Sequence, residues 1–117
     1  MTDKVWGTTH PLVVLTIKEV HRLNIKAGGY CSEHYHNGKH NSFFVVSGTL
    51  EITEWSTLTG EEIITVLEAG QAHVVPAMVW HKFRAITDCV CHELYYNDDN
   101  SPIDPDDIVR RTEGGVL

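Results

Sequence analysis

The sequence has few basic residues and no long apolar run, and each shortage excludes a class of protein. Nine Lys and Arg residues against 16 Asp and Glu residues give a formal charge of −7. No concentrated basic face is therefore expected for the phosphates of a nucleic acid. No apolar run approaches the roughly 20 residues that span a bilayer, and the N-terminus lacks the pattern of a signal peptide. We therefore expect no nucleic-acid partner, no membrane partner and a cytoplasmic location.

The sequence also lacks an even set of cysteines. Cys31, Cys89 and Cys91 cannot all pair within one chain, which favours a reducing compartment. Cys89 and Cys91 are separated by one residue, whereas structural zinc pairs more often have two or more residues between them. We interpret these thiols as core residues.

The length of 117 residues predicts a single domain over residues 1–117. Short runs of alternating or β-branched apolar residues recur between Gly, Asn and Pro turn signals. We expect some eight or nine strands, with a barrel over about residues 10–97 and a polar tail over 98–117. The absence of a long amphipathic helix predicts an all-β fold, a closed antiparallel barrel or a sandwich. In the tail, Asp104, Pro105 and two further acids predict one or two helical turns from Pro105 to Arg111.

Histidines are concentrated just before one of the predicted strands. His34, His36 and His40 fall within a few residues of one another. His34 and His36 are two residues apart, so on an extended strand their imidazoles point to the same face. Two neutral imidazoles on one face can converge on a divalent cation.

The spacing of glycines and histidines resembles the two motifs of the cupin family. Gly28, His34, His36 and Gly48 stand at the spacing of the first motif, but Asn41 replaces its usual glutamate. The second motif is matched by Gly70, Pro76 and His81, with departures at Met78 and Ala85. The resemblance implies a cupin-type jelly roll that holds one divalent transition metal on His34, His36 and His81. Zinc, iron, nickel, manganese, cobalt and copper all suit imidazole ligands, so the metal stays open.

Two residues compete for the place of the missing glutamate. The motif spacing points Asn41 inward, whereas His40 offers the better ligand for a transition metal. Adjacent residues of a strand point opposite ways, so one of the two faces outward. We prefer His40 and keep Asn41 as the alternative.

A narrower resemblance covers roughly the last 75 residues. The run DDIVR at residues 106–110, together with the preceding strand pattern, resembles the cupin domain of type II mannose-6-phosphate isomerases and mannose-1-phosphate guanylyltransferases. That resemblance implies a sugar or sugar-phosphate substrate. A phosphate needs basic residues at the cavity, and we interpret the available ones as solvated surface charges, which weakens this hypothesis. They are Lys39, Lys82, Arg84, Arg110 and Arg111.

The remaining candidates concern chemistry beside the metal. Glu93 is a candidate general base if its strand face is the interior, and Tyr95 and Tyr30 are further catalytic candidates. The functions considered are a metal-dependent isomerase, epimerase, lyase or dioxygenase, and a metal-containing module that binds a ligand without turnover. A three-histidine iron dioxygenase is a further alternative. The expected partners are a small sugar, sugar phosphate or organic acid in the barrel and, from the resemblance, a second copy in a homodimer.

Overall fold

The computed structural model describes residues 1–117, which form strands, turns and loops and no helix. The strands of the first half are β1 (Thr2–Lys4), β2 (Gly7–Val14), β3 (Lys18–Ile25), β4 (Gly29–Tyr30), β5 (His34–Tyr35) and β6 (His40–Ser47). Those of the second half are β7 (Leu50–Trp55), β8 (Glu62–Leu67), β9 (Ala72–Val75), β10 (His81–Ala85), β11 (Cys89–Tyr96), β12 (Val109–Arg110) and β13 (Gly115–Val116). No helix long and apolar enough to cross a membrane is present.

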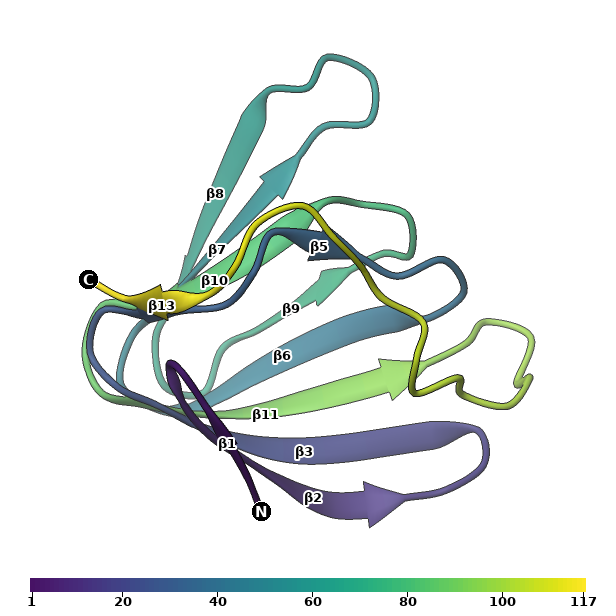
Figure 1. The fold of residues 1–117 in the computed structure, drawn as a ribbon, viewed down its shortest axis with the longest axis horizontal. Helices are drawn as coiled ribbons and strands as arrows, with labels where there is room; N and C mark the ends of the chain where they lie inside the picture. Colours follow the sequence, from purple (N-terminus) through teal and green to yellow (C-terminus); the bar gives the residue numbers. More distant parts are fainter.

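The strands form two antiparallel sheets that face each other (Figure 1). One sheet has the order β1-β2-β3-β11-β6-β9, and the other has the order β12-β5-β10-β4-β13. In the second sheet β7 also pairs with β10, and β8 pairs only with β7. This arrangement confirms the predicted all-β antiparallel jelly roll. The N-terminal residues, which the sequence patterns had left outside the barrel, form β1 and the start of β2.

The interior changes from apolar to polar along the strands. On β6 the inward residues run from Val45 and Phe43 to Asn41, and all three are buried. On β11, which pairs with β6, Cys91 lies opposite Val45 and Glu93 lies opposite Phe43. One end of the barrel is therefore a hydrophobic core, and the other end gathers buried polar side chains.

The C-terminal tail returns across the mouth of the barrel as extended chain (Figure 1). The predicted helical turn from Pro105 to Arg111 is absent. Asp104 instead accepts a hydrogen bond from the Asp106 N–H, and the chain then straightens into β12, where Arg110 pairs with His34. Pairing with β5 satisfies the backbone of the tail, which is why its local helix signals are overridden.

The three cysteines are free and buried, and two of them belong to strand β11. Burial raises the pKa of Cys31 to about 12 and that of Cys89 to about 11, and it also raises the pKa of Cys91.

Because the thiolate is the reactive form of cysteine, we expect native protein at pH 8 to react with a thiol reagent far more slowly than unfolded protein. Mass spectrometry after brief iodoacetamide treatment, with and without guanidinium, measures this. Complete labelling of the native protein at the unfolded rate would contradict the prediction.

Candidate metal centre

Three histidines meet at the polar end of the barrel. His34 begins β5, His36 follows that strand, and His81 begins β10. His34 and His81 are direct partners in the antiparallel pair of β5 and β10, where opposite side chains lie close together. The two-residue spacing brings His36 to the same face as His34.

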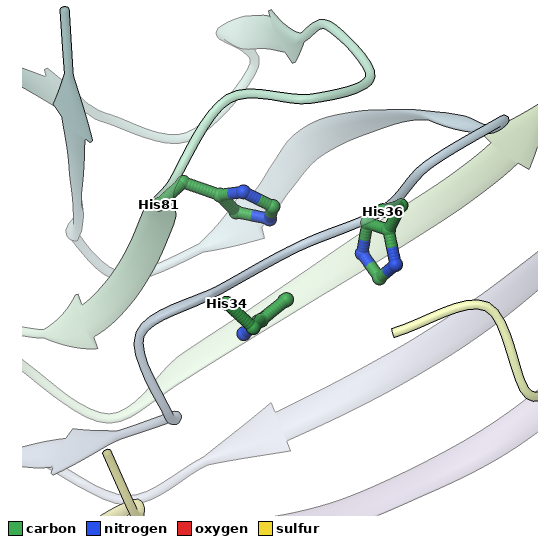
Figure 2. Close-up of side chains that lie close together, drawn as sticks. All are labelled: His34, His36 and His81. Carbon is green, nitrogen blue, oxygen red and sulfur yellow. The ribbon is translucent and has the colours of Figure 1, made fainter. Parts of the chain in front are cut away.

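The three imidazoles lie close enough to share one ion. Their ring centroids are 4.4 Å apart for His34 and His81, 5.1 Å for His34 and His36, and 5.6 Å for His36 and His81. One ligand nitrogen from each ring lies within 4.8 Å of the other two. Figure 2 shows the three rings turned toward a common space.

Backbone carbonyls fix which nitrogen of each ring carries the proton. The Nδ1 atom of His34 lies 2.7 Å from the backbone oxygen of Ser32, and that of His36 lies 2.7 Å from the backbone oxygen of Asp107. The Nδ1 atom of His81 lies 2.9 Å from the backbone oxygen of Val79. A carbonyl oxygen can only accept a hydrogen bond, so Nδ1 is the protonated nitrogen and Nε2 keeps its lone pair. This is the orientation in which metal-binding histidines are held.

Two of the unprotonated ring nitrogens have no hydrogen-bond partner, which leaves them available to a metal. Nε2 of His36 and Nε2 of His81 are buried and form no hydrogen bond. Buried polar atoms are nearly always paired, because an unpaired one keeps the cost of its lost hydration. A divalent ion on the three Nε2 atoms would remove that cost. The all-imidazole set suits a transition metal better than calcium or magnesium, which prefer oxygen ligands.

The histidines are also in the right protonation state. Burial, followed by the neighbouring imidazoles, lowers the pKa of His34 to about 3. Burial lowers the pKa of His81 to about 4 and also lowers the pKa of His36. All three rings are therefore neutral at pH 7, which is the form that binds metal without first releasing a proton.

His40 lies outside this group. Its Nδ1 accepts a hydrogen bond from the Ala77 N–H at 3.0 Å, and its Nε2 lies 2.7 Å from the Asp98 carboxylate. Both ring nitrogens are thus engaged away from the three histidines, which differs from our preference for His40 as the fourth ligand. Strand alternation explains the difference, because Asn41 occupies the inward face of β6. Asn41 is fully buried, and its Oδ1 has no hydrogen-bond partner.

A cavity of about 670 Å³ adjoins two of the three histidines, His34 and His36. It is lined among others by His34, His36, Glu93, Tyr95, Lys39 and His21. Tyr30, the third of the catalytic candidates, is not among its lining residues and packs instead against Gly115. We call this space the barrel cavity.

Glu93 points into the barrel cavity from β11. Its carboxylate accepts a hydrogen bond from the Asn41 amide at 3.1 Å. Burial raises the pKa of Glu93, against the opposing effect of hydrogen bonds from Asn41 and Tyr95. The raised pKa brings this carboxyl closer to the range in which it can both give and take a proton.

Several residues around the site are not among the candidates that the sequence predicts. Lys39, which the sequence suggested as a surface charge, is only 5% exposed and lines the barrel cavity. Its two-residue spacing from Asn41 was an available hint, since both then share a strand face. His21, Arg110 and Asp107 reach the site through long-range contacts that no local pattern announces.

Asp107 holds the first histidine segment in place. Its backbone oxygen accepts a hydrogen bond from the His36 ring. Its carboxylate accepts hydrogen bonds from the backbone N–H groups of Asn37 and Gly38 at 2.7 and 2.8 Å. Asp107→Ala removes both carboxylate contacts with the turn but keeps the backbone contact with His36. We therefore expect zinc binding to weaken by about 10-fold, the lower end of the effect of losing an outer contact. Calorimetric zinc titration measures the effect. Asp106→Ala is the matched control, and equal affinities for the two variants would contradict the role of Asp107.

Known proteins share the fold and part of the sequence pattern. A sequence model described as "Cupin domain" matches residues 21–95. No curated protein sequence gives a significant match. KdgF from Halomonas sp. has a similar structure, with a TM-score of 0.71, 18% identity, and coverage of 83% of this chain and 85% of that chain.

Larger proteins contain a similar unit. CapF gives a TM-score of 0.75 at 20% identity, and the match covers 94% of this chain but only 33% of CapF. Oxalate decarboxylase from Bacillus subtilis gives a TM-score of 0.74 at 14% identity, and the match covers 90% of this chain and 28% of that protein. The chain therefore spans about a third of these two proteins, and identities this low establish the fold alone. The mannose-phosphate resemblance stays a prediction.

Proposed function

Because this chain belongs to the cupin family, we propose that it binds one divalent transition metal on His34, His36 and His81 and acts on a small molecule in the barrel cavity. The observation that carries the proposal is the pair of buried, unpartnered Nε2 atoms on His36 and His81. A metal bound there would supply Lewis acidity toward an oxygen of the substrate. The donor set leaves its identity open among zinc, iron, nickel, manganese, cobalt and copper.

Glu93 is the proposed proton-transfer group. It lines the barrel cavity with His34 and His36, and Asn41 and Tyr95 orient its carboxyl. A carboxyl with a raised pKa can take a proton from a bound substrate at one atom and return it at another. This favours an isomerase, an epimerase or a lyase, with a sugar, a sugar phosphate or a small organic acid as substrate. Glu93→Gln tests the role, because the amide keeps the shape and loses the proton transfer.

Metal content tests the first part of the proposal. Protein purified without added metal and then titrated with zinc should reach about one equivalent. Failure to bind even about a tenth of an equivalent would contradict the proposal. If metal binds but no substrate is turned over, and ligands bind equally well to wild type and Glu93→Gln, the chain is a non-catalytic binding module.

The donor set favours one further activity. Asn41 stands where the family motif has glutamate, so the three imidazoles have no carboxylate beside them in the ligand set. A neutral three-histidine set also suits iron and therefore an iron dioxygenase. Oxygen consumption by iron-loaded protein with a thiol or diketone substrate distinguishes this activity from isomerisation, which consumes no oxygen.

We further propose a cytoplasmic homodimer. The three free cysteines fit a reducing compartment. Strand β8 pairs with β7 alone and exposes Ile63, Ile64 and Val66, which lie on both of its faces. An exposed apolar edge strand is usually covered, and a second copy would cover it. Light scattering after gel filtration measures the mass, and a monomer at all concentrations would contradict the dimer.

A further inference from the structure

A buried lysine lies on the wall of the barrel cavity. Lys39 is 5% exposed and lines the cavity together with His36 and Tyr95. Lysine is almost never buried to this degree unless its charge is paired. The environment of its ammonium group therefore indicates what the cavity binds.

The protein itself pairs this ammonium only in part. Nζ donates one hydrogen bond, to the Asp104 backbone oxygen at 3.1 Å, and lies 4.4 Å from the centroid of the Tyr95 ring. No carboxylate of the chain forms an ion pair with Lys39. An ammonium has three donors, so its hydrogen-bonding capacity and its charge are both left available.

The ammonium of Lys39 and the ring of His36 contact the same tyrosine. The Tyr95 ring that Nζ contacts is 5.3 Å from the His36 ring, centroid to centroid. Burial lowers the pKa of His36, and the positive charge of Lys39 acts in the same direction. Lys39 and His36 thus share a neighbour and both line the barrel cavity, so an occupant of that cavity can lie between them.

The charge beside the candidate metal centre favours an anionic occupant. A dipositive ion on three neutral imidazoles would add to the charge of Lys39, with Asn41 rather than a carboxylate at the family's glutamate position. Among the basic residues of the cavity lining Lys39 alone is buried, since Lys4 and Arg110 are exposed. The acidic residues of the lining are Asp3, Glu19, Glu93 and Glu113. Like charges that lie close together repel, and an anion bound between them relieves that repulsion.

We propose that the barrel cavity binds a small carboxylate, whose charge is held by Lys39 while its other end faces His34 and His36. A carboxylate is favoured over a phosphate because Glu93 and Glu19 also line the cavity and would repel a doubly charged group. This proposal rests on the proposed metal-binding function and names the class of molecule that the site takes.

Lactate and lactamide test the proposal, because they have nearly the same shape and differ in charge. The protein is loaded with cobalt(II), and the visible absorption of the bound ion reports both metal binding and ligand binding. Lactate should shift this spectrum with saturation, whereas lactamide should not.

In Lys39→Met the dissociation constant for lactate should rise by about 10- to 100-fold, which is the contribution of one charge-assisted hydrogen bond. Its affinity for cobalt should be unchanged or higher, because a repelling charge is removed.

Two variants serve as controls. Lys26→Met removes an exposed charge outside the cavity and should leave lactate binding at the wild-type level. Lys39→Arg keeps the charge and should retain more lactate affinity than Lys39→Met. Equal lactate affinity in wild type and Lys39→Met, equal binding of lactamide, or tighter binding of inorganic phosphate would overturn the carboxylate proposal while metal binding stands. Failure of the wild type to bind cobalt would overturn the metal proposal and this one with it.

Discussion

His81→Ala is expected to lower the affinity of the protein for cobalt(II) or zinc by more than about 100-fold, beyond the effect of losing a supporting hydrogen bond. The variant removes one of only three converging nitrogens, and the remaining pair belongs to a single short segment. His81 is also the one ligand supplied by β10, so its loss leaves the ion unattached to that strand. Calorimetric titration of the metal-free protein measures the change in affinity.

The matched control is His92→Ala. His92 lies on β11 and its Nε2 accepts a hydrogen bond from Arg22 on the outer surface. We expect wild-type metal affinity for this variant. Circular dichroism of both metal-free variants checks that each is folded. Equal affinities for His81→Ala and His92→Ala would contradict the assignment of the site.

Gly48→Ala is expected to destabilise the fold by at least about 3 kcal/mol, in the upper range for single substitutions. Gly48 has a φ of +83°, and a Cβ added there would lie 2.1 Å from the Asp88 backbone oxygen and 2.9 Å from the Cys89 Cα. Both atoms belong to backbone at the start of β11, so the clash cannot be relieved by turning a side chain. Relief would require moving β11, which carries Glu93 into the cavity.

Gly70→Ala separates crowding from backbone conformation. Gly70 has a φ of +87°, but an added Cβ meets nothing within 4 Å. Only the strain of a left-handed residue remains, which costs about 1–2 kcal/mol. Urea denaturation followed by circular dichroism gives both free energies of unfolding. A Gly48→Ala variant no less stable than Gly70→Ala would show that the close approach to Asp88 is not a constraint.

The sequence predicted the three histidines because their geometry is set locally or by a motif. His34 and His36 share a face through the two-residue period of extended chain, and motif spacing added His81. Met78 stands where the second motif has glycine, yet it keeps a left-handed φ of 70° and donates its N–H to the His36 oxygen at 2.7 Å. The turn is therefore imposed by its packing against the first motif.

The choice between His40 and Asn41 shows where chemistry and geometry compete. Imidazole is the better ligand, but the period of β6 points the side chain of Asn41 inward and leaves His40 to Ala77 and Asp98. Strand direction outweighs ligand quality because turning one side chain would require shifting the whole register. The register signal was present in the sequence.

The spacing of Lys39 from Asn41 indicates only which way its side chain points, and its burial depends on residues far away in the sequence. It follows a polar turn, where a lysine is ordinarily solvated. The C-terminal tail covers Lys39. The backbone oxygen of Asp104 accepts a hydrogen bond from Nζ of Lys39, and the carboxylate of Asp107 accepts one from the turn that precedes Lys39. These contacts join residues more than 60 positions apart, and they depend on a tail that forms β12 instead of the predicted helical turn.

Locating the metal tests the central claim most directly. A crystal structure of zinc-loaded protein, with anomalous data collected on both sides of the metal absorption edge, shows the position of the ion. We predict one ion bound by Nε2 of His34, His36 and His81 at about 2.0–2.1 Å, with His40 still bonded to Ala77 and Asp98. A protein without an ion in the barrel, or an ion held by His40 in place of His81, would contradict the account.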